Sequence, residues 1–501
     1  MMTGSVRTAS LGALAHAAAV ASVFGLVGYA ISFATNLLAA RQFVPAAFGQ
    51  FSLAQTILGL AAVIAYFGIP AGVQRFVPYY QAKRAVPLLR GYLRFSLALP
   101  LAIAAGISLV LIIGAQTITD LFGFVPEFTT SIRLVAIALP FITVSAVFGP
   151  LLISQRRVMQ DSIRYNVFEK LTFLLLLLCI IKLDLGIVWV VAAMTVSIII
   201  ACGYSVVSVA RLQLPWHGKA LLQSTEWLAF SVPLVLSGAF AIFIGWSDKI
   251  IIAAMLDAEA VGVYSVALSF AMLAGFFQSA FASLFLPTIS RHHAKDDRDG
   301  ILFFFRKLAL WTLICSLPIV LFMVFYGEQL LFFFYGPAYR AGAAALAVLS
   351  FGLLINVSTG LNKDILLLHG KTRFIFVLNV CLAIVNVLGN IVLITYWGIV
   401  GAAVATAVTM ALDNLISLGV ALRYERLRFD GKRTLLVIAS ALIALMPSAY
   451  VMQLPLPAVA RAGLVGILYV AVYALLLVGG RIVGDDERRV IMSSLRGFWR
   501  T

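Results

Sequence analysis

The sequence predicts an all-α polytopic membrane protein with about fourteen transmembrane helices, and three observations favour this fold class. Of the 501 residues, 62% are hydrophobic and 11% are charged, whereas soluble domains carry about 25% charged residues. Apolar runs repeatedly reach the roughly 20 residues that a helix needs to cross about 30 Å of hydrocarbon. A unit of about 210 residues also occurs twice. We therefore expect two parallel six-helix repeats, an N-lobe and a C-lobe, around a central cavity, followed by two C-terminal helices.

The expected spans are apolar runs bounded by charged residues, Gly or Pro. They lie near residues 14–39, 48–69, 92–114, 131–153, 165–182, 187–209, 227–254, 262–285, 304–326, 343–366, 374–395, 398–420, 434–452 and 460–480. The first run has no Asp, Glu, Lys or Arg from Thr8 to Ala40. A secretory signal has an apolar core of only about 7–15 residues, so this run is expected to remain as a span.

Short matches at nearly one offset reveal the repeat. The pairs are residues 47–54 and 260–267 (AFGQFSLA and AVGVYSVA, offset 213), 76–78 and 285–287 (offset 209), and 186–188 and 398–400 (offset 212). Six spans per copy is an even number, so both copies enter the bilayer the same way up. The expected N-lobe is residues 1–213, the C-lobe is 214–425, and 426–501 carry the last two spans and a basic tail.

The distribution of basic residues predicts the orientation. Thirty of the 36 Lys and Arg residues fall in segments on one side of the expected spans, and five fall on the other. Because cytoplasmic loops collect Lys and Arg, both termini are expected in the cytoplasm. This bias also explains the net charge of +16 without a nucleic-acid partner. No GxxxxGK[ST] phosphate loop is present, so we expect no nucleotide site.

Cysteine and histidine usage gives no indication of a metal site. The four cysteines lie in apolar runs without CxxC spacing, and we expect them to be reduced: Cys179, Cys202, Cys315 and Cys381. His292 and His293 lie in a mixed-charge loop, which is typical of a solvated cytoplasmic face.

Charged residues inside expected spans are the candidates for chemistry, because such charges are costly and mark a pathway or an ion pair. Asp248 and Lys249 are both in the span at 227–254. Neighbours on a helix point about 100° apart, so at least one of the two must face a partner or a wet cavity. The alternative is that Lys249 extends to the outer surface and Asp248 meets a structural donor.

Two arginines are further candidates for the wall of the central cavity. Arg41 ends the first span, and Arg75 lies near the inner end of a second span that continues past a break at Pro70. Repeat symmetry places the first two spans opposite the seventh and eighth. The substrate-cavity candidates are therefore Arg41, Arg75, Asp248 and Lys249. Alternatively, Arg41 is an interfacial anchor and Arg75 an ordinary cytoplasmic charge.

A second set of charged residues could accept protons or bind a coupling cation, with ion pairing as the alternative. This set is Glu169, Lys170, Lys363, Asp364 and Asp413. The asparagines in or near the spans are expected to hydrogen bond between helices. They are Asn36, Asn166, Asn356, Asn379, Asn386, Asn390 and Asn414.

Four stretches resemble the oligosaccharide flippase branch of the multidrug/oligosaccharidyl-lipid/polysaccharide exporter superfamily. They are residues 41–69 (RQFVPAAFGQFSLA, then YFGI), 247–267 (SDKIII, then GVYSVA), 335–346 (YGPAYRAGAAAL) and 398–405 (GIVGAAVA). The resemblance covers all fourteen spans. Arg41 and Asp248 fall on positions where the family often carries these residue types, whereas Arg75 and Lys249 depend on our placement of the spans.

The resemblance implies a flippase that moves undecaprenyl-diphosphate-linked oligosaccharide from the inner to the outer leaflet of the bacterial cytoplasmic membrane, for O-antigen, capsule or exopolysaccharide synthesis. It implies a cationic cavity between the lobes. No cofactor is expected, although H+, Na+ or the membrane potential could supply energy. The expected partners are the lipid-linked glycan, the bilayer, and a polysaccharide polymerase with its glycosyltransferases.

Three alternatives stay open at this point. A cation-coupled drug antiporter and a lipid II flippase belong to the same superfamily. A membrane-embedded glycosyltransferase or polymerase would also handle lipid-linked sugars, but such enzymes usually carry acidic catalytic residues on large outer loops. The expected outer loops of this chain are short and hold few acidic residues, so we do not expect an enzyme.

Overall fold

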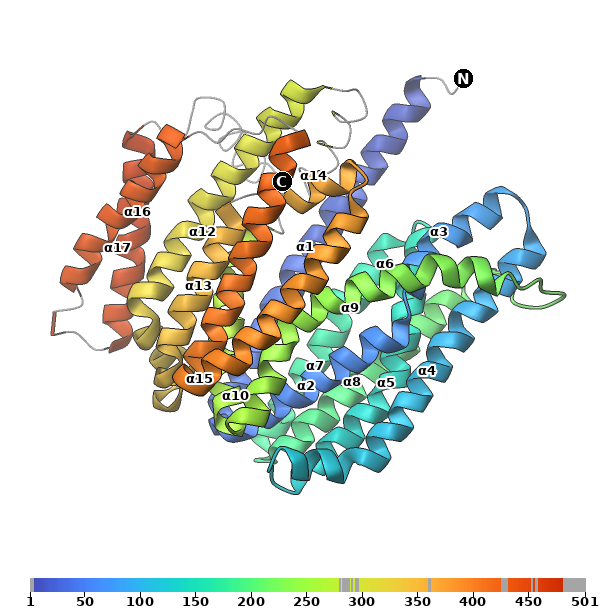
Figure 1. The fold of residues 1–501 in the computed structure, drawn as a ribbon, viewed down its shortest axis with the longest axis horizontal. Coiled ribbons are helices and arrows are strands. Elements are labelled where there is room, and N and C mark those ends of the chain that lie inside the picture. Colours follow the sequence, from blue (N-terminus) through green and yellow to red (C-terminus); the bar gives the residue numbers. More distant parts are fainter. Residues whose placement is uncertain are drawn as a thin grey trace. The chain divides into compact units, whose positions relative to one another are not determined.

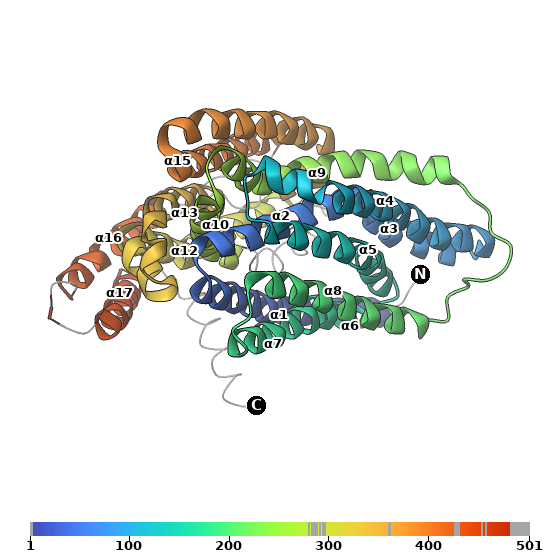
Figure 2. The ribbon, with the colours of Figure 1, turned by 90° about the horizontal axis from the view of Figure 1, so that it is seen from below.

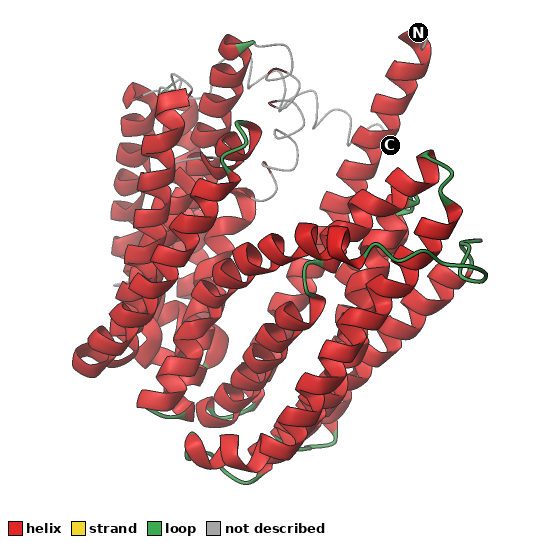
Figure 3. Ribbon diagram, turned by 45° about the vertical axis from the view of Figure 1, so that its right-hand side comes forward, coloured by secondary structure: helices red, strands yellow, loops and turns green. Residues whose placement is uncertain are grey.

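The computed structural model describes residues 4–278, 281, 289, 292, 297–358, 362–424, 431–451, 454–455 and 458–480. Throughout these residues the chain forms helices joined by loops (Figure 3). Ten of the described helical stretches are long and apolar enough to cross a membrane, and each of the fourteen expected spans overlaps a described helix. The prediction of an all-α polytopic membrane protein is confirmed.

The chain forms two compact units, and their helices are labelled in Figure 1. The first unit comprises Met1–Ser269 and Lys371–Thr409. Its helices are α1 (Gly4–Gln42), α2 (Pro45–Tyr66), α3 (Ile69–Ala82), α4 (Val86–Leu121), α5 (Glu127–Ser154), α6 (Val158–Ile163), the π-helical turn η1 (Arg164–Phe168), α7 (Glu169–Lys182), α8 (Ile187–Ala210), α9 (Ser224–Met255), most of α10 (Ala258–Ala271) and the first part of α15 (Thr372–Tyr424). Within this unit α5 packs between α4 and α8 (Figure 2).

The second unit comprises Phe270–Gly370 and Met410–Thr501. Its described helices are η2 (Met272–Gly275), α12 (Arg298–Tyr335), η3 (Pro337–Gly342), α13 (Ala343–Ser358), α14 (Asn362–Leu368), the end of α15, α16 (Gly431–Val451) and α17 (Ala458–Gly479). The helix α12 packs along α13 and also against α16 and α17. Buried apolar residues such as Leu317, Ala441 and Tyr469 form the core of this packing.

Two helix breaks follow from backbone conformation. The sequence predicts a break of the second span at Pro70, but the break lies earlier, at Phe67 and Gly68, which have φ of 48° and 66°. Pro70 instead occupies the first turn of α3, where its missing N–H has no helical partner to lose. In α15, Gly398 has φ 55° and ψ −135°. This kink lies at the first residue of the span expected at 398–420, just after the span expected at 374–395.

The predicted lobes and the observed units divide the chain on different grounds. The lobes at 1–213, 214–425 and 426–501 come from the repeat, whereas the units come from packing. The helix α9 belongs to the expected C-lobe but packs on α2 and α3, so it falls in the first unit. The division into lobes stays a prediction.

Candidate functional site

Asp248 lies at the centre of a buried polar network within the first unit. The side chain is only 1% exposed. Its Oδ2 accepts hydrogen bonds from the hydroxyls of Tyr264, at 2.6 Å, and Thr406, at 2.5 Å. Its Oδ1 accepts one from Asn390 Nδ2 at 2.9 Å. These donors come from α10 and α15, so one carboxylate of α9 links three helices.

The carboxyl group of Asp248 is surrounded by neutral hydrogen-bond donors. Among the described residues, no cation forms an ion pair with it. Burial of a carboxylate is tolerated only where hydrogen bonds replace the water that it loses. Asp248 is therefore a buried carboxyl group whose two oxygens are hydrogen bonded to neutral side chains.

Two asparagines one turn apart on α15 extend the network. Asn390 Nδ2 also donates to Asn386 Oδ1 at 3.1 Å, and Ser247 Oγ donates to the same oxygen at 3.0 Å. The Asn390 Oδ1 atom is buried and has no hydrogen-bond partner in the described structure. Carboxylate, amide and hydroxyl oxygens are the ligands that hard cations prefer. The described residues contain no cluster of three or more His, Cys, Asp or Glu that could hold a metal ion.

Lys249 points away from Asp248 and toward α2. Its Nζ lies 3.0 Å from Ser52 Oγ, and Ser52 Oγ donates to Ser265 Oγ at 2.7 Å. The side chain of Lys249 is partly buried. Ser52 and Ser265 are 213 residues apart, the offset of the strongest sequence match. Two repeat-equivalent serines therefore touch each other.

The helices α2 and α10 cross at two glycines that are also equivalent in the repeat. A Cβ atom on Gly49 would lie 1.8 Å from the carbonyl oxygen of Ala258. A Cβ atom on Gly262 would lie 2.0 Å from the carbonyl oxygen of Pro45. Only glycine permits this close approach of two backbones. Because Pro45 and Ala258 are equivalent as well, the contact is reciprocal, as at a two-fold axis.

Arg41 and Arg75 are both exposed. Arg41 lies in the last turn of α1. The guanidinium carbon of Arg75 lies 4.4 Å from the ring centroid of Phe230 on α9 and 5.3 Å from that of Phe76, which is a cation–π arrangement. Within the described residues, neither arginine forms a hydrogen bond or an ion pair with Asp248 or Lys249. The role of these four residues in a substrate cavity stays a prediction.

The structure brings together two of the five coupling candidates. In the second unit, Lys363 Nζ and Asp413 Oδ2 form an ion pair at 2.7 Å between α14 and α15. In the first unit, Glu169 and Lys170 occupy the first turn of α7, and Lys170 Nζ lies 5.4 Å from the ring centroid of Tyr165. Asp364 has no ion-pair partner in the described part of the chain. A coupling role for any of the five stays a prediction.

Sequence reasoning missed a buried ion pair in the first unit. Arg164 is 5% exposed, and its Nη2 and Nε atoms lie 2.7 Å and 3.2 Å from Asp161 Oδ1. In the charge count that predicts orientation, Arg164 is one cytoplasmic charge among thirty. The spacing of three residues between Asp161 and Arg164 was the available signal. Tyr264 and Thr406 gave no such signal, because neutral residues on distant helices reveal no pairing.

The structure describes one of the two adjacent histidines. His292 Nδ1 lies 2.7 Å from Asp297 Oδ2. His293 lies outside the described residues.

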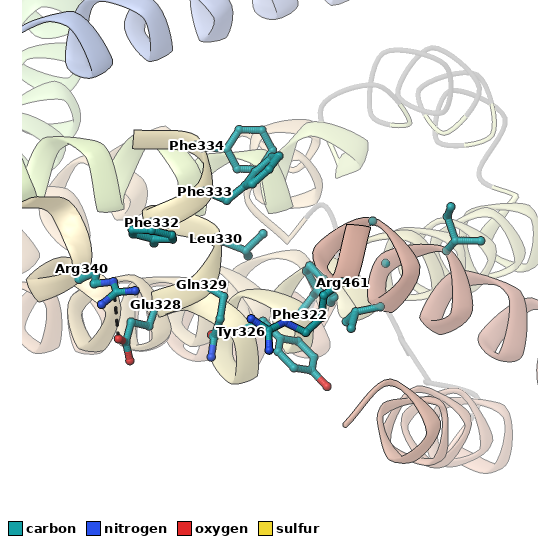
Figure 4. A pocket seen from close by; sticks show the side chains of 14 residues that line it. Phe322, Tyr326, Glu328, Gln329, Leu330, Phe332, Phe333, Phe334, Arg340 and Arg461 are labelled. Atoms are coloured by element: carbon teal, nitrogen blue, oxygen red, sulfur yellow. Dashed lines mark ion pairs between the residues drawn. The ribbon is translucent and has the colours of Figure 1, made fainter. Parts of the chain in front are cut away.

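A cavity of about 630 Å³ lies in the second unit, between the end of α12, η3 and α17 (Figure 4). Its wall is mostly aromatic and aliphatic, with Phe322 and Phe332 among the lining residues. Arg340 lies at its edge, 3.9 Å from Glu328 and with its guanidinium 4.2 Å from the Phe332 ring centroid. Such a lining suits a hydrocarbon chain better than a hydrated sugar.

Comparison with known families identifies the class. The chain matches the family model described as Polysaccharide biosynthesis protein over residues 14–293, more than half of its length. The MatE model matches residues 233–392. The fold and these matches define the polysaccharide flippase branch of the multidrug/oligosaccharidyl-lipid/polysaccharide exporter superfamily. The chain belongs to the polysaccharide biosynthesis protein family.

Individual relatives are distant but cover most of the chain. An uncharacterized membrane protein of Methanocaldococcus jannaschii is 20% identical over 481 residues, covering 93% of this chain and 95% of that protein. A probable low-salt glycan biosynthesis flippase of Haloferax volcanii is 22% identical over 404 residues, covering 79% and 80%. The solved structure of the lipid II flippase MurJ, in an inward closed conformation, has a TM-score of 0.75 at 16% identity, covering 93% of this chain and 99% of that one. The likeness to MurJ shows a shared fold.

These findings establish a flippase-like membrane transporter involved in glycan biosynthesis.

Proposed function

We propose that the protein moves undecaprenyl-diphosphate-linked oligosaccharide from the inner to the outer leaflet of a bacterial cytoplasmic membrane by alternating access, for O-antigen, capsule or exopolysaccharide synthesis. The observation that carries the proposal is the family match over residues 14–293 on a chain that shares the fold of the lipid II flippase MurJ. The name of the Haloferax volcanii relative, a glycan biosynthesis flippase, supports it.

The physical chemistry of the substrate explains why such a protein is needed. Each buried polar group that loses water without gaining a partner costs roughly 1–3 kcal/mol on protein-based scales. An oligosaccharide diphosphate therefore does not cross hydrocarbon unaided. The polyprenyl tail does not leave the bilayer either, because burial is worth about 0.8 kcal/mol per CH₂. A protein with a polar passage that is open to the lipid on one side resolves both problems. The headgroup crosses through the passage while the tail stays in the bilayer.

The crossing of α2 and α10 supports alternating access. Two repeats that touch through equivalent residues can move apart without either repeat unfolding. At this crossing the contacts are two glycine backbones and one pair of serines. The residues that lead into this crossing, near Arg41 and Met255, belong to loops that the charge bias predicts to be outside. We assign the crossing as the contact that closes the outer end of the passage.

The energy source is proposed to be H+, Na+ or the membrane potential, with no bound cofactor. Asp248 is the carboxylate best placed to respond to a cation, because it is buried, lacks an ion pair among the described residues and adjoins the unpartnered oxygen of Asn390. Both termini are proposed to lie in the cytoplasm. A polysaccharide polymerase and glycosyltransferases are proposed partners, and the protein itself is proposed not to be an enzyme.

The second candidate function is a cation-coupled antiporter of drugs or other small molecules. The match of residues 233–392 to the MatE model favours it. A lipid II flippase differs from the first proposal only in the headgroup carried. Transport measurements with defined substrates separate the three.

The test is reconstitution of the full chain into vesicles that contain a fluorescent polyprenyl-diphosphate oligosaccharide. A membrane-impermeant quencher reports the fraction in the outer leaflet over time. We expect the protein to accelerate exchange between leaflets over protein-free vesicles. Vesicles that instead accumulate an organic cation, or exchange lipid II alone, would support the alternatives.

The cavity assignment is tested with a charge-matched pair of variants. The triple change Arg41→Ala, Arg75→Ala and Lys249→Ala is expected to slow flipping by about tenfold or more, since each charge-assisted contact to a diphosphate is worth about 1.5–3 kcal/mol. The control removes three cations that we do not place in the passage: Arg133, Lys182 and Lys219. Equal rates in both triples would overturn the site assignment while leaving the flippase proposal intact.

A further inference from the structure

A second cavity, of about 810 Å³, lies entirely within the first unit. It is formed where three connections meet: the turn between α3 and α4, the turn between α5 and α6, and the segment that follows α8. Each connection contributes one arginine to the lining, namely Arg84, Arg157 and Arg211. We call this cavity the arginine pocket.

The three guanidinium groups have no anionic partner in the described structure. None of them forms an ion pair, and no Asp or Glu lines the pocket. The shortest hydrogen bond of the three is a weak one, from Arg157 Nη1 to Gln160 Oε1 at 3.4 Å. Like charges that share a site repel each other, so an anion bound among them would stabilise the arrangement.

The general excess of basic residues on this side does not by itself explain the pocket. The positive-inside bias requires only that these connections carry Lys or Arg. It does not require one arginine from each of three connections to line one cavity. The convergence is therefore a separate observation from the charge count.

Hydrogen bonds hold the walls of the pocket in place. Gln81 and Gln155 exchange two side-chain hydrogen bonds, at 3.2 Å and 3.1 Å, and so tie α3 to the end of α5. Tyr80 OH accepts a hydrogen bond from Trp227 Nε1 at 2.9 Å. Arg94 Nη2 donates to the carbonyl oxygen of Trp216 at 2.9 Å and fixes the segment after α8. These contacts connect the segments that line the pocket to neighbouring helices.

Arg84 occupies a backbone position at which glycine is usual. Arg84 has φ 53° just past the end of α3, a left-handed position that glycine usually occupies because other residues are strained there. The backbone N–H of Ala85 donates a hydrogen bond to the carbonyl oxygen of Tyr80 at 3.0 Å across this turn. Backbone outliers of this kind are common at functional sites, and the guanidinium is what arginine adds over glycine.

We propose that the arginine pocket binds a phosphate-bearing anion, with Arg84, Arg157 and Arg211 as its cationic ligands. The planar guanidinium presents paired N–H donors that match phosphate oxygens. The second N–H of the Gln81 amide offers a neutral donor beside them. The volume lies in the range of small-ligand sites, about 300–1,000 Å³, which fits a diphosphate or a glycerophosphate headgroup. None of the three arginines is among the substrate-cavity candidates Arg41, Arg75, Asp248 and Lys249, and the test of this site needs no transport.

The phosphate could come from a lipid headgroup in the inner leaflet or from solution, and the experiment has one arm for each source. In the first arm, inorganic pyrophosphate is titrated into the purified full-length protein by calorimetry. In the second, nanodiscs of phosphatidylglycerol or phosphatidylcholine are compared by native mass spectrometry for lipid that stays bound. We expect saturable binding in at least one arm, weaker at high salt because the contacts are ionic.

Variants assign the binding to the pocket. Arg84→Gln with Arg157→Gln and Arg211→Gln is expected to weaken binding by about tenfold or more, as for the loss of a charge-assisted hydrogen bond. The control, Lys219→Gln with Arg373→Gln and Lys432→Gln, removes the same charge from the same predicted face and should bind as the unmodified protein does. Loss of pyrophosphate binding in the pocket triple supports a soluble ligand, and loss of retained phosphatidylglycerol alone supports a lipid.

A single variant keeps the proposal testable if the triple variant misfolds. Arg84→Gly relieves the left-handed backbone, so it should not lower the thermal unfolding temperature, yet it should weaken binding severalfold. Absence of binding in both arms, or equal binding by the pocket and control triples, would overturn the proposal.

Discussion

At the scale of single residues, Asp248 shows how a buried charge is tolerated in this chain. Three donors from α10 and α15 replace its water. The carboxylate in turn accepts the hydrogen bond that the buried hydroxyl of Tyr264 donates. If the carboxylate were removed, buried donors would lose their acceptor, and the protein would lose stability.

We predict that Asp248→Ala destabilises the protein by several kcal/mol, because each buried donor left without an acceptor costs about 1–3 kcal/mol. Thermal unfolding of the detergent-solubilised protein, followed by tryptophan fluorescence, measures the effect. The control Asp120→Ala removes an exposed carboxylate and should change stability by less than about 0.5 kcal/mol. Equal unfolding temperatures for the two variants would show that the network is not stabilising.

The sequence alone allowed only some of the residues of this network to be predicted. Asp248 and Lys249 could be singled out because a charge inside an apolar run is costly. The partners of Asp248 could not, since Tyr264, Asn390 and Thr406 are neutral and lie 16, 142 and 158 residues away. Only folding brings such residues together. Arg164 could have been paired with Asp161 from spacing alone.

At the scale of elements, the crossing of α2 and α10 depends on Gly49 and Gly262. Any side chain there meets a carbonyl oxygen of the other helix at about 2 Å or less. The backbone cannot move aside as a flexible side chain would. Close packing of helices through small residues is common in membrane proteins.

We predict that Gly49→Val or Gly262→Val forces α2 and α10 apart and lowers stability, at a cost typical of overpacking, about 1–3 kcal/mol. Thermal unfolding again measures the change. Gly106→Val and Gly114→Val serve as controls, because no heavy atom lies within 4 Å of a Cβ built at either position. A crossing that tolerated valine as well as the control sites do would not be the close contact described.

Element positions were largely predictable, and element breaks were not. Apolar runs bounded by charge locate helices because a span must be continuous and apolar. The break between α2 and α3 came at Phe67 and Gly68, not at Pro70, because proline is tolerated in a first helical turn. The π-helical turn η1 and the short helix α6 have no periodic signal that a reading of apolar runs could detect.

At the scale of the whole molecule, the repeat found in the sequence is the property that relates fold to function. An offset of 213 residues in the sequence becomes a hydrogen bond between Ser52 and Ser265. The reciprocal contacts of Gly49 and Gly262 repeat the same relation in the backbone. Sequence could predict that the copies are related, but not which residues meet at the axis, because the axis depends on packing.

The most direct measurement of the central claim, that a lipid-linked glycan crosses when the two repeats separate at this axis, uses a reversible cross-link. Ser52→Cys and Ser265→Cys are introduced after Cys179, Cys202, Cys315 and Cys381 are changed to Ser. The two hydroxyl oxygens are 2.7 Å apart, which is close enough for a disulfide after small adjustment. A matched control pair, Thr119→Cys and Thr129→Cys, has hydroxyls 2.9 Å apart within one repeat.

Flipping of the fluorescent polyprenyl-diphosphate oligosaccharide is then measured in vesicles before and after reduction. We expect the oxidised Ser52→Cys and Ser265→Cys protein to flip no faster than protein-free vesicles, and reduction to restore the rate. The control pair should flip at the same rate in both states. Equal, protein-dependent flipping by the oxidised and reduced forms of the first pair would contradict the account.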